Sequence, residues 1–165
     1  VDFCEEYATV IDLIPRYSNL LVMRTFSKIF GLAGLRIGYA AARDNVISDL
    51  SRLLIPFSVS QAALVAAKAA LQDTEFLERS YRHVYIERKR LETYFKSKDW
   101  FCYPSQTNFI YVEIPIPDIQ AQLEEKGILI RPLKSFGFSD NAFRVSIGTV
   151  EEDGAFIAAI EELLD

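Results

Sequence analysis

The stretch Thr25-Phe-Ser-Lys28-Ile-Phe-Gly31-Leu-Ala-Gly34-Leu-Arg36-Ile-Gly38-Tyr39 joins two apolar runs, residues 20–23 and 35–42, and predicts a strand, a loop and a second strand. The loop contains two hydroxyl side chains, one lysine, three glycines and, eight residues after the lysine, one arginine. Glycines allow the backbone to come close to a bulky group. Because guanidinium and hydroxyl donors match phosphate oxygens, the set indicates a phosphate site and leaves Lys28 for another task.

A second interpretation of this loop stays open on composition alone, because glycine-rich surface loops with ordinary charges are common. A nucleotide-binding P-loop is excluded, since Lys28 precedes the glycines and the chain has no G-x-x-x-x-G-K-[ST] run. Lysine and arginine are costly to bury without a partner, so these cations need either solvent or an anion.

The pattern T-F-S-K-x-F-G-L-A-G-L-R-x-G-Y closely resembles the cofactor-lysine segment of fold-type I pyridoxal-phosphate aminotransferases, in particular the histidinol-phosphate aminotransferase family. Later segments occur in the family's order, so the resemblance covers almost the whole chain. It implies that Lys28 is the Schiff-base lysine and that Thr25, Ser27 and Arg36 hold the phosphate of pyridoxal 5'-phosphate. A strand-end arginine facing solvent is the alternative for Arg36.

Arg131 and Arg144 form a second candidate group, each on a predicted strand. Two strand arginines are most often solvated or salt-bridged. However, F-R-V-S-I-G-T around Arg144 resembles the family's substrate-anion segment, which implies that Arg144 binds the carboxylate of a substrate such as glutamate. The same resemblance implies that Arg131 helps to bind a phosphate and that Asn108, in Gln106-Thr107-Asn108-Phe109, lines the pocket. An asparagine that closes a turn is an equally good account of Asn108.

The function implied by the resemblance is transamination, most specifically of histidinol phosphate and 2-oxoglutarate to imidazole acetol phosphate and glutamate, in histidine biosynthesis. A threonine-phosphate decarboxylase, or an aminotransferase for aromatic or other amino acids, is the alternative within the same fold. The family's dimeric active site implies a homodimer. A non-catalytic folding or dimerisation piece is the alternative from another class.

Composition limits the other classes of function. The chain has 165 residues and a formal net charge of -5, and this acidic balance argues against a nucleic-acid partner. No apolar run is long enough to span a membrane, and the acidic start does not resemble a signal peptide. Cys4 and Cys102 are too few for a disulfide framework, and no cluster has metal-ligand spacing. We therefore expect a cytoplasmic protein without a metal site.

The chain begins at Val1 rather than at methionine. In the resembled family a D-E-A-Y segment comes immediately before the equivalent of this start, and its aspartate and tyrosine bind the cofactor's ring. We therefore expect a C-terminal portion of a larger enzyme that is inactive by itself.

The expected fold is α/β: the end of a large cofactor domain over residues 1–73, an interdomain helix over 74–98, and a small α+β domain over 99–165. His83 and the charged residues of the long helix are expected to face solvent. Strands are expected at residues 20–24 (buried), 36–42, 100–103, 108–114, 128–131 and 142–147, and the resemblance implies that the first two run antiparallel. Helices are expected at 4–15 (short or broken, with Tyr7 in its apolar pattern), at 44–54 with Asp44 as N-cap, at 60–71 started by Ser58 or Ser60, at 74–98 capped by Asp73 or Thr74, at 118–126, and from Thr149 onward in a capping box with Glu152.

Overall fold

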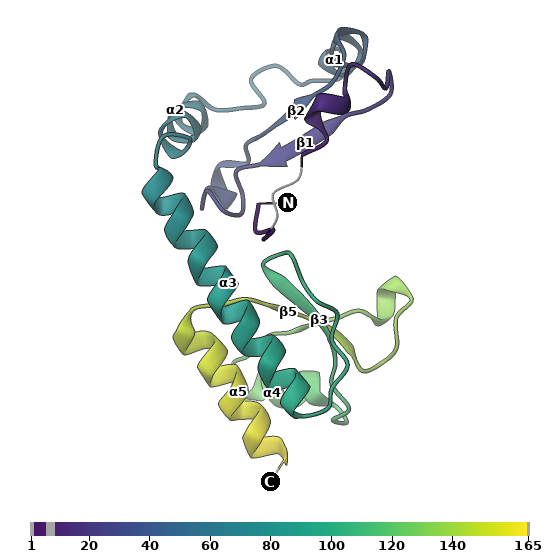
Figure 1. Ribbon diagram of the computed structural model, residues 1–165, viewed down its shortest axis with the longest axis vertical. Coiled ribbons are helices and arrows are strands. Elements are labelled where there is room, and N and C mark those ends of the chain that lie inside the picture. Colours follow the sequence, from purple (N-terminus) through teal and green to yellow (C-terminus); the bar gives the residue numbers. More distant parts are fainter. Residues whose placement is uncertain (1, 6–8, 165) are drawn as a thin grey trace. The chain divides into compact units, whose positions relative to one another are not determined.

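The computed structural model describes residues 2–5 and 9–164, and it combines helices with antiparallel sheets, which confirms the mixed α/β class. The chain divides into two compact units, Val1–Tyr81 and Arg82–Asp165. The division falls inside the longest helix, α3 (Thr74–Ser97), which runs on from one unit into the other (Figure 1).

Unit 1 is built on a two-stranded sheet. Strands β1 (Val22–Thr25) and β2 (Gly38–Ala41) pair antiparallel, as expected, and the register places Thr25 opposite Gly38. The expectation of a buried strand at residues 20–24 is wrong, because no residue of β1 is buried and Met23 is 70% exposed. Within the part of the chain that the structure describes, the apolar core of this unit lies beside the sheet, among Phe26, Ile37, Ala63 and Ala67.

The helices of unit 1 are α1 (Asp44–Ser51) and α2 (Gln61–Ala70). Of the two predicted starts of α2, Ser58 and Ser60, the structure selects Ser60, whose hydroxyl accepts a hydrogen bond from the Ala63 amide at 3.1 Å. The predicted Asp44 cap of α1 is wrong: Arg43 holds the N-cap position, and Asp44 is the first helical residue, where its charge favours the positive end of the helix dipole.

Two further helix predictions in unit 1 were too long. Helix α1 ends at Ser51 instead of residue 54, because the apolar side chains that follow are at least 66% exposed and supply no packing to extend it (Leu53, Leu54 and Ile55). In the described part of the expected helix at residues 4–15, which leaves out residues 6–8, the structure shows one 3-10 turn, Ile11–Leu13. Tyr7, which was part of the apolar pattern for that helix, lies outside the described residues.

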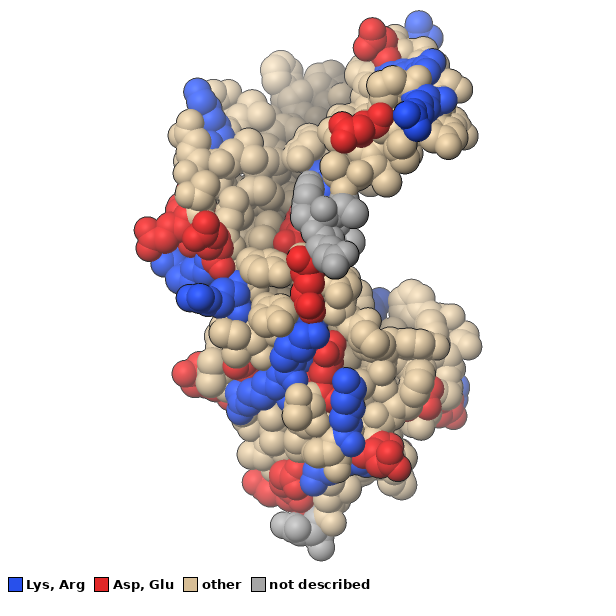
Figure 2. Space-filling model, in the orientation of Figure 1, with Lys and Arg blue, Asp and Glu red and all other residues tan. Residues whose placement is uncertain are grey.

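Helix α3 begins and ends where its sequence predicts. The Asp73 carboxylate accepts a hydrogen bond from the Phe76 amide at 3.0 Å, which satisfies one of the free amides of the first turn. Acidic and basic side chains alternate over the face that Figure 2 shows, without one large area of a single sign.

Unit 2 is a three-stranded antiparallel sheet covered on one face by helices. Its strand order is β3 (Phe109–Glu113), β5 (Ala142–Ser146) and β4 (Arg131–Pro132). The core lies between this sheet and the helices α3, α4 (Ile119–Glu125) and α5 (Val150–Leu164). Its largest fully buried apolar side chains come from β3 and the residue that follows it, and from all three helices: Leu91, Phe95, Ile110, Val112, Ile114, Ile119, Leu123 and Ile160.

Two strand predictions in unit 2 need correction. The strand expected at residues 128–131 begins only at Arg131, because the Ile128 amide is used to close the end of α4 by donating to Leu123 O at 2.9 Å. Gly127 permits that closure, since its φ of 75° is a left-handed conformation. The strand expected at residues 100–103 is a single bridge, Cys102 to Val112, which is followed by Pro104.

Helix α5 begins with the predicted capping box. The Thr149 hydroxyl accepts from the Glu152 amide at 3.2 Å, and the Glu152 carboxylate accepts from the Thr149 amide at 2.8 Å. These reciprocal bonds satisfy two amides at the start of the helix.

Replacing Thr149 by alanine is expected to lower the free energy of unfolding by about 1 kcal/mol, because one helix amide loses its acceptor. Urea unfolding followed by circular dichroism measures the change. Glu151→Gln, at the exposed neighbouring position, is the matched control and is expected to have a smaller effect. Equal effects of the two substitutions would contradict the assignment of the cap.

Among residues 2–5 and 9–164, no helix has the length and apolar character needed to cross a bilayer. The same residues contain no group of three or more histidine, cysteine, aspartate or glutamate side chains able to hold a metal ion.

Candidate functional site

The loop between β1 and β2 has a fixed base. The Phe26 amide donates to Ile37 O at 3.1 Å, and Phe26 O accepts from the Leu32 amide at 2.9 Å. The Phe26 side chain is only 4% exposed, and its ring lies 4.7 Å from that of Phe30. This anchor presents Lys28, whose side chain is exposed, from a loop with a defined conformation.

The two hydroxyl residues before Lys28 are brought together by a local turn. The Ser27 amide donates to the Thr25 hydroxyl oxygen at 3.0 Å. An oxygen that accepts in this way retains its own proton for donation to another group. The Lys28 carbonyl in turn accepts from the Gly31 amide at 2.9 Å, and the φ of 69° at Gly31 suits glycine.

Arg36 lies at the other end of the loop in a strained conformation. Its φ of 50° and ψ of 49° are left-handed values that a side chain disfavours. The guanidinium donates to Ala33 O at 2.7 Å, and the exposed side chain keeps further N–H donors. Among the described residues, Arg36 therefore bonds to Ala33 within its own loop, and no contact joins it directly to Thr25, Ser27 or Lys28.

Gly38 explains why the loop can close onto the sheet. A Cβ atom at this position would lie 2.6 Å from Arg24 O, closer than side chains tolerate. The close pairing of Thr25 with Gly38 beside the loop therefore requires glycine.

In unit 2, the two predicted arginines lie directly opposite each other across neighbouring strands. The register pairs Arg131 of β4 with Arg144 of β5, although thirteen residues separate them in the sequence. Like charges at such positions repel unless an anion or a carboxylate lies between them. Neither arginine has an ion-pair partner among residues 2–5 and 9–164, and the buried Nε of Arg144 has no hydrogen-bond partner there.

Aromatic rings flank both arginines. The Arg144 guanidinium carbon lies 5.1 Å from the centre of the Phe109 ring, and that of Arg131 lies 5.3 Å from the centre of the Phe136 ring. Tyr111 is the register partner of Arg144 on the other side of β5. These rings support the planar guanidinium groups and leave their N–H edges to bind an anion.

Asn108 lies immediately before β3, at the edge of the same sheet. Its carbonyl accepts from the Ile147 amide at 2.9 Å, and its side chain is half-buried. The carbonyl of the preceding residue, Thr107, accepts from Arg88 Nη1 at 3.1 Å. Asn108 thus lies beside the same sheet as Arg144, but at the end of the strand pair, and no contact among the described residues joins their side chains.

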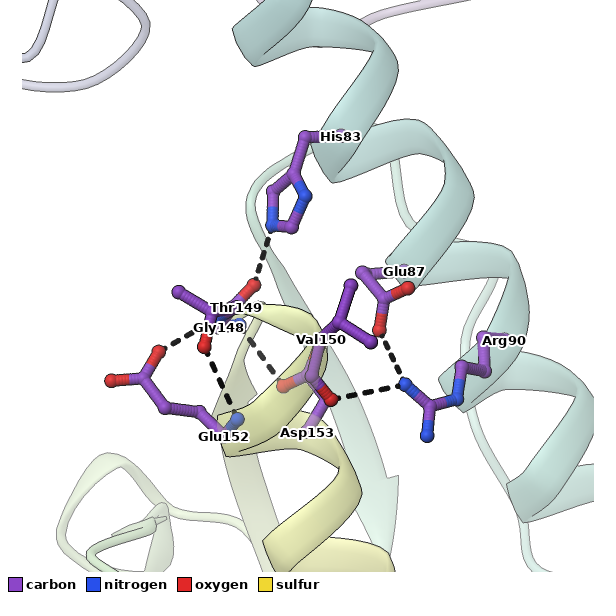
Figure 3. Close-up of polar contacts among 8 residues, drawn as sticks. All are labelled: His83, Glu87, Arg90, Gly148, Thr149, Val150, Glu152 and Asp153. Atoms are coloured by element: carbon purple, nitrogen blue, oxygen red, sulfur yellow. Dashed lines mark hydrogen bonds and ion pairs between the residues drawn. The ribbon is translucent and has the colours of Figure 1, made fainter.

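A polar cluster between α3 and the start of α5 was not expected from the sequence (Figure 3). His83 is half-buried rather than solvated, because its Nε2 lies 2.7 Å from Gly148 O and donates a hydrogen bond to it. Arg90 bridges Glu87 at 2.8 Å and Val150 O at 3.3 Å. The Gly148 amide donates to the buried carboxylate of Asp153 at 3.0 Å.

The charged residues of α3 are also more buried than expected. Arg88 is 0% exposed, and Glu87 and Glu92 are at most 5% exposed. One signal was present in the sequence: Val84, Leu91 and Phe95 continue an apolar stripe in which position 88 is the missing member. A charged residue on such a stripe indicates a buried, hydrogen-bonded role.

Burial raises the pKa of Asp153, and the nearby Glu87 carboxylate raises it further; the Gly148 amide, Arg90 and His83 oppose the shift. The folded protein therefore binds this proton more tightly than the unfolded chain does. The free energy of unfolding therefore falls as the pH rises from the ordinary pKa of an aspartate through the raised pKa of Asp153. Well below the ordinary pKa the carboxyl group is protonated in both states, and the folded state pays no such penalty.

Asp153→Asn is expected to remove this pH dependence, while its side-chain oxygen can still accept from the Gly148 amide. Relative to the unsubstituted protein, the variant gains stability as the pH increases from about 3 to about 7. Urea unfolding across this range measures the difference. Parallel stability curves for the two proteins would show that the Asp153 carboxyl group does not titrate differently on folding.

Comparison with known proteins assigns the family. The model of the family "Aminotransferase class I and II" matches residues 1–160. The chain is 37% identical over 163 residues to histidinol-phosphate aminotransferase 1 of Bacillus cereus, covering 98% of this chain and 44% of that protein. It is 41% identical over 155 residues to the histidinol-phosphate aminotransferase of Methanocaldococcus jannaschii, covering 91% of this chain and 42% of that protein.

A solved structure shows the same fold. The histidinol-phosphate aminotransferase of Sinorhizobium meliloti, in complex with pyridoxal-5'-phosphate, has a TM-score of 0.81 and 28% identity, covering 93% of this chain and 43% of that one. The chain thus spans less than half the length of these relatives. With a family model matching nearly all of its residues, the chain belongs to the class I and II aminotransferases.

Proposed function

We propose that the protein is a pyridoxal 5'-phosphate-dependent aminotransferase and that its amino substrate is histidinol phosphate. The observation that carries the proposal is the anchored loop from Thr25 to Arg36, within a chain that belongs to the aminotransferase family. The names of the relatives support the more specific substrate.

The residues of the loop fit the chemistry of this cofactor. Thr25 retains a hydroxyl proton, Ser27 contributes a second hydroxyl, and Arg36 has an exposed guanidinium. This is the donor set that a phosphate dianion needs. Lys28 supplies an exposed amine with no ion-pair partner among residues 2–5 and 9–164, so it is available for covalent attachment to an aldehyde.

The cofactor, when bound, supplies an electron sink for the carbon that bears the amino group. Lys28 Nζ would hold the cofactor aldehyde, and the same amine would be the base that takes the proton from that carbon. Arg36, Ser27 and Thr25 would hold the phosphate and so fix the position from which Nζ acts. Return of the amino group to a 2-oxo acid completes a ping-pong cycle.

Unit 2 would supply recognition of the substrate's anionic group. Arg144 and Arg131 carry two like charges on opposed positions, and a carboxylate or a phosphate is the ligand that relieves their repulsion. The same pair could bind the phosphate of histidinol phosphate and the carboxylate of glutamate in alternate half-reactions. Asn108 would line the pocket beside them.

The remaining parts of the proposal concern the whole protein. We propose that the protein is a cytoplasmic homodimer. We also propose that residues 1–73 belong to a large cofactor domain, residues 74–98 form an interdomain helix, and residues 99–165 form a small domain. Size-exclusion chromatography with light scattering tests the dimer.

The function is tested with a panel of amino donors and 2-oxoglutarate, using the chain completed to the length of its relatives and loaded with pyridoxal 5'-phosphate. Histidinol phosphate is expected to react fastest. If other amino acids react and histidinol phosphate does not, the proposed substrate is wrong but the proposed reaction, transamination, stands. Release of carbon dioxide from threonine phosphate would indicate a decarboxylase instead.

A further inference from the structure

The edge of the unit 2 sheet where β3 begins and β5 ends is held by side chains of α3. At this edge the Ile147 amide donates to Asn108 O at 2.9 Å, which is the last link between the two strands. Strand ends open easily when only one main-chain bond holds them. Asn108 therefore needs further support if its side chain is to keep one position.

Two cationic or polar side chains of α3 supply that support from either side of the link. Arg88 Nη1 donates to Thr107 O at 3.1 Å, and this carbonyl belongs to the peptide whose amide is that of Asn108. His83 Nε2 donates to Gly148 O at 2.7 Å, one residue beyond Ile147. A carbonyl only accepts, so His83 carries its proton on Nε2.

The surroundings make both contacts costly to lose. Arg88 is fully buried, so its charge relies on the acceptors that it meets. One turn further along α3, Glu92 accepts from the Ser105 amide at 3.0 Å and fixes the segment before Thr107. On the other side, Asp153 accepts from the Gly148 amide, so both polar groups of Gly148 are held (Figure 3).

We infer that His83 and Arg88 are positioning residues for Asn108: they clamp the Thr107 and Gly148 carbonyls on either side of the Asn108–Ile147 link. The inference rests on the proposed function, in which Asn108 lines the substrate pocket. Neither residue touches the substrate. Both act by setting the place and angle at which the Asn108 carboxamide leaves the sheet.

The kinetic test compares His83→Leu, which removes the donor, with His83→Gln, whose carboxamide can still donate to Gly148 O. Lys98→Met is the matched control, because it breaks another contact between α3 and α5, Lys98 to Glu161 at 2.7 Å, away from this edge. In the completed, cofactor-loaded enzyme, His83→Leu is expected to raise the KM for the amino donor about tenfold, with a smaller change in kcat.

His83→Gln is expected to restore most of the affinity that His83→Leu loses. Lys98→Met is expected to lower the thermal midpoint about as much as His83→Leu does, but to leave the KM unchanged. Arg88→Lys, which keeps a charge but loses the guanidinium geometry, is expected to behave like His83→Leu. An unchanged KM in His83→Leu, or the same rise in Lys98→Met, would overturn the inference.

A second readout needs no turnover. The side-chain amide signals of Asn108 in a proton–nitrogen NMR spectrum of this 165-residue chain are assigned by their loss in Asn108→Asp. They are expected to shift or broaden in His83→Leu and to stay in place in Lys98→Met. Unaltered signals in His83→Leu would refute the positioning role. Absence of transamination by the unsubstituted enzyme would refute the proposed function, while these signals would still decide the positioning role.

Discussion

Replacing Lys28 by alanine is expected to abolish covalent cofactor attachment and to lower kcat for transamination by about 10³-fold or more. The reason is that one amine would serve both as the attachment point and as the base that moves the substrate proton. No other lysine lies in the loop from Thr25 to Arg36. Borohydride reduction followed by mass spectrometry of the peptides identifies the lysine that carries the cofactor. Fixed-time assays of product formation measure kcat.

Lys68→Ala is the matched control for this substitution. Lys68 is an exposed lysine on α2 of the same unit, so its loss removes a charge without touching the loop. Attachment and rate are expected to be unchanged in this variant. A Lys28→Ala enzyme that still carries the reduced cofactor would show that another amine holds it.

Replacing Arg144 by alanine is expected to raise the KM for glutamate about 100-fold, because a carboxylate loses charge-assisted hydrogen bonds in a partly buried place. Cofactor attachment at Lys28 should persist, which separates the two roles. Steady-state kinetics with glutamate as the varied substrate measure the effect. The buried, unpartnered Nε of Arg144 gives the sharpest structural reason to choose this residue.

Two companion variants sharpen the result. Arg144→Lys keeps the charge but not the planar fork of donors, so it is expected to recover only part of the affinity. Lys134→Ala removes an exposed cation of the neighbouring segment, which pairs with Asp140 at 3.0 Å, and should leave the KM unaltered. If Lys134→Ala and Arg144→Ala raised the KM equally, general electrostatic attraction would account for anion binding instead of a specific grip.

Local signals in the sequence were sufficient for much of the fold. Ser60, Asp73 and Thr149 each cap a helix through a bond to an amide three residues ahead, and such contacts depend only on neighbours in the chain. The apolar runs located β1 and β2, and their antiparallel pairing, which the family resemblance implied, is confirmed. By contrast, the predicted start of β4 was wrong. The Ile128 amide closes the end of α4 and is not free to pair in a sheet, and the pattern of apolar residues does not reveal this.

The candidate site shows the same division. The loop from Thr25 to Arg36 is contiguous, so its residue types suggested a phosphate site, while the roles of Lys28 and Arg36 came from the family resemblance and stay predictions. The opposition of Arg131 and Arg144 depends on strand register, and the buried contacts of His83 and Arg88 depend on which segments pack against α3. A histidine among charged neighbours looks solvated until the carbonyl of a residue 65 positions away is placed beside it.

The opposed arginines also have a consequence for handling the protein. A folded sheet that holds Arg131 beside Arg144 is stabilised by any small multivalent anion that binds there, in proportion to the logarithm of its concentration once the site fills. Sulfate or phosphate in a storage buffer would therefore raise the apparent melting temperature and, under the proposed function, would at the same time compete with the substrate. Assays of this protein are best performed in chloride buffers free of sulfate, phosphate and carboxylates, and sulfate is the anion to add for storage.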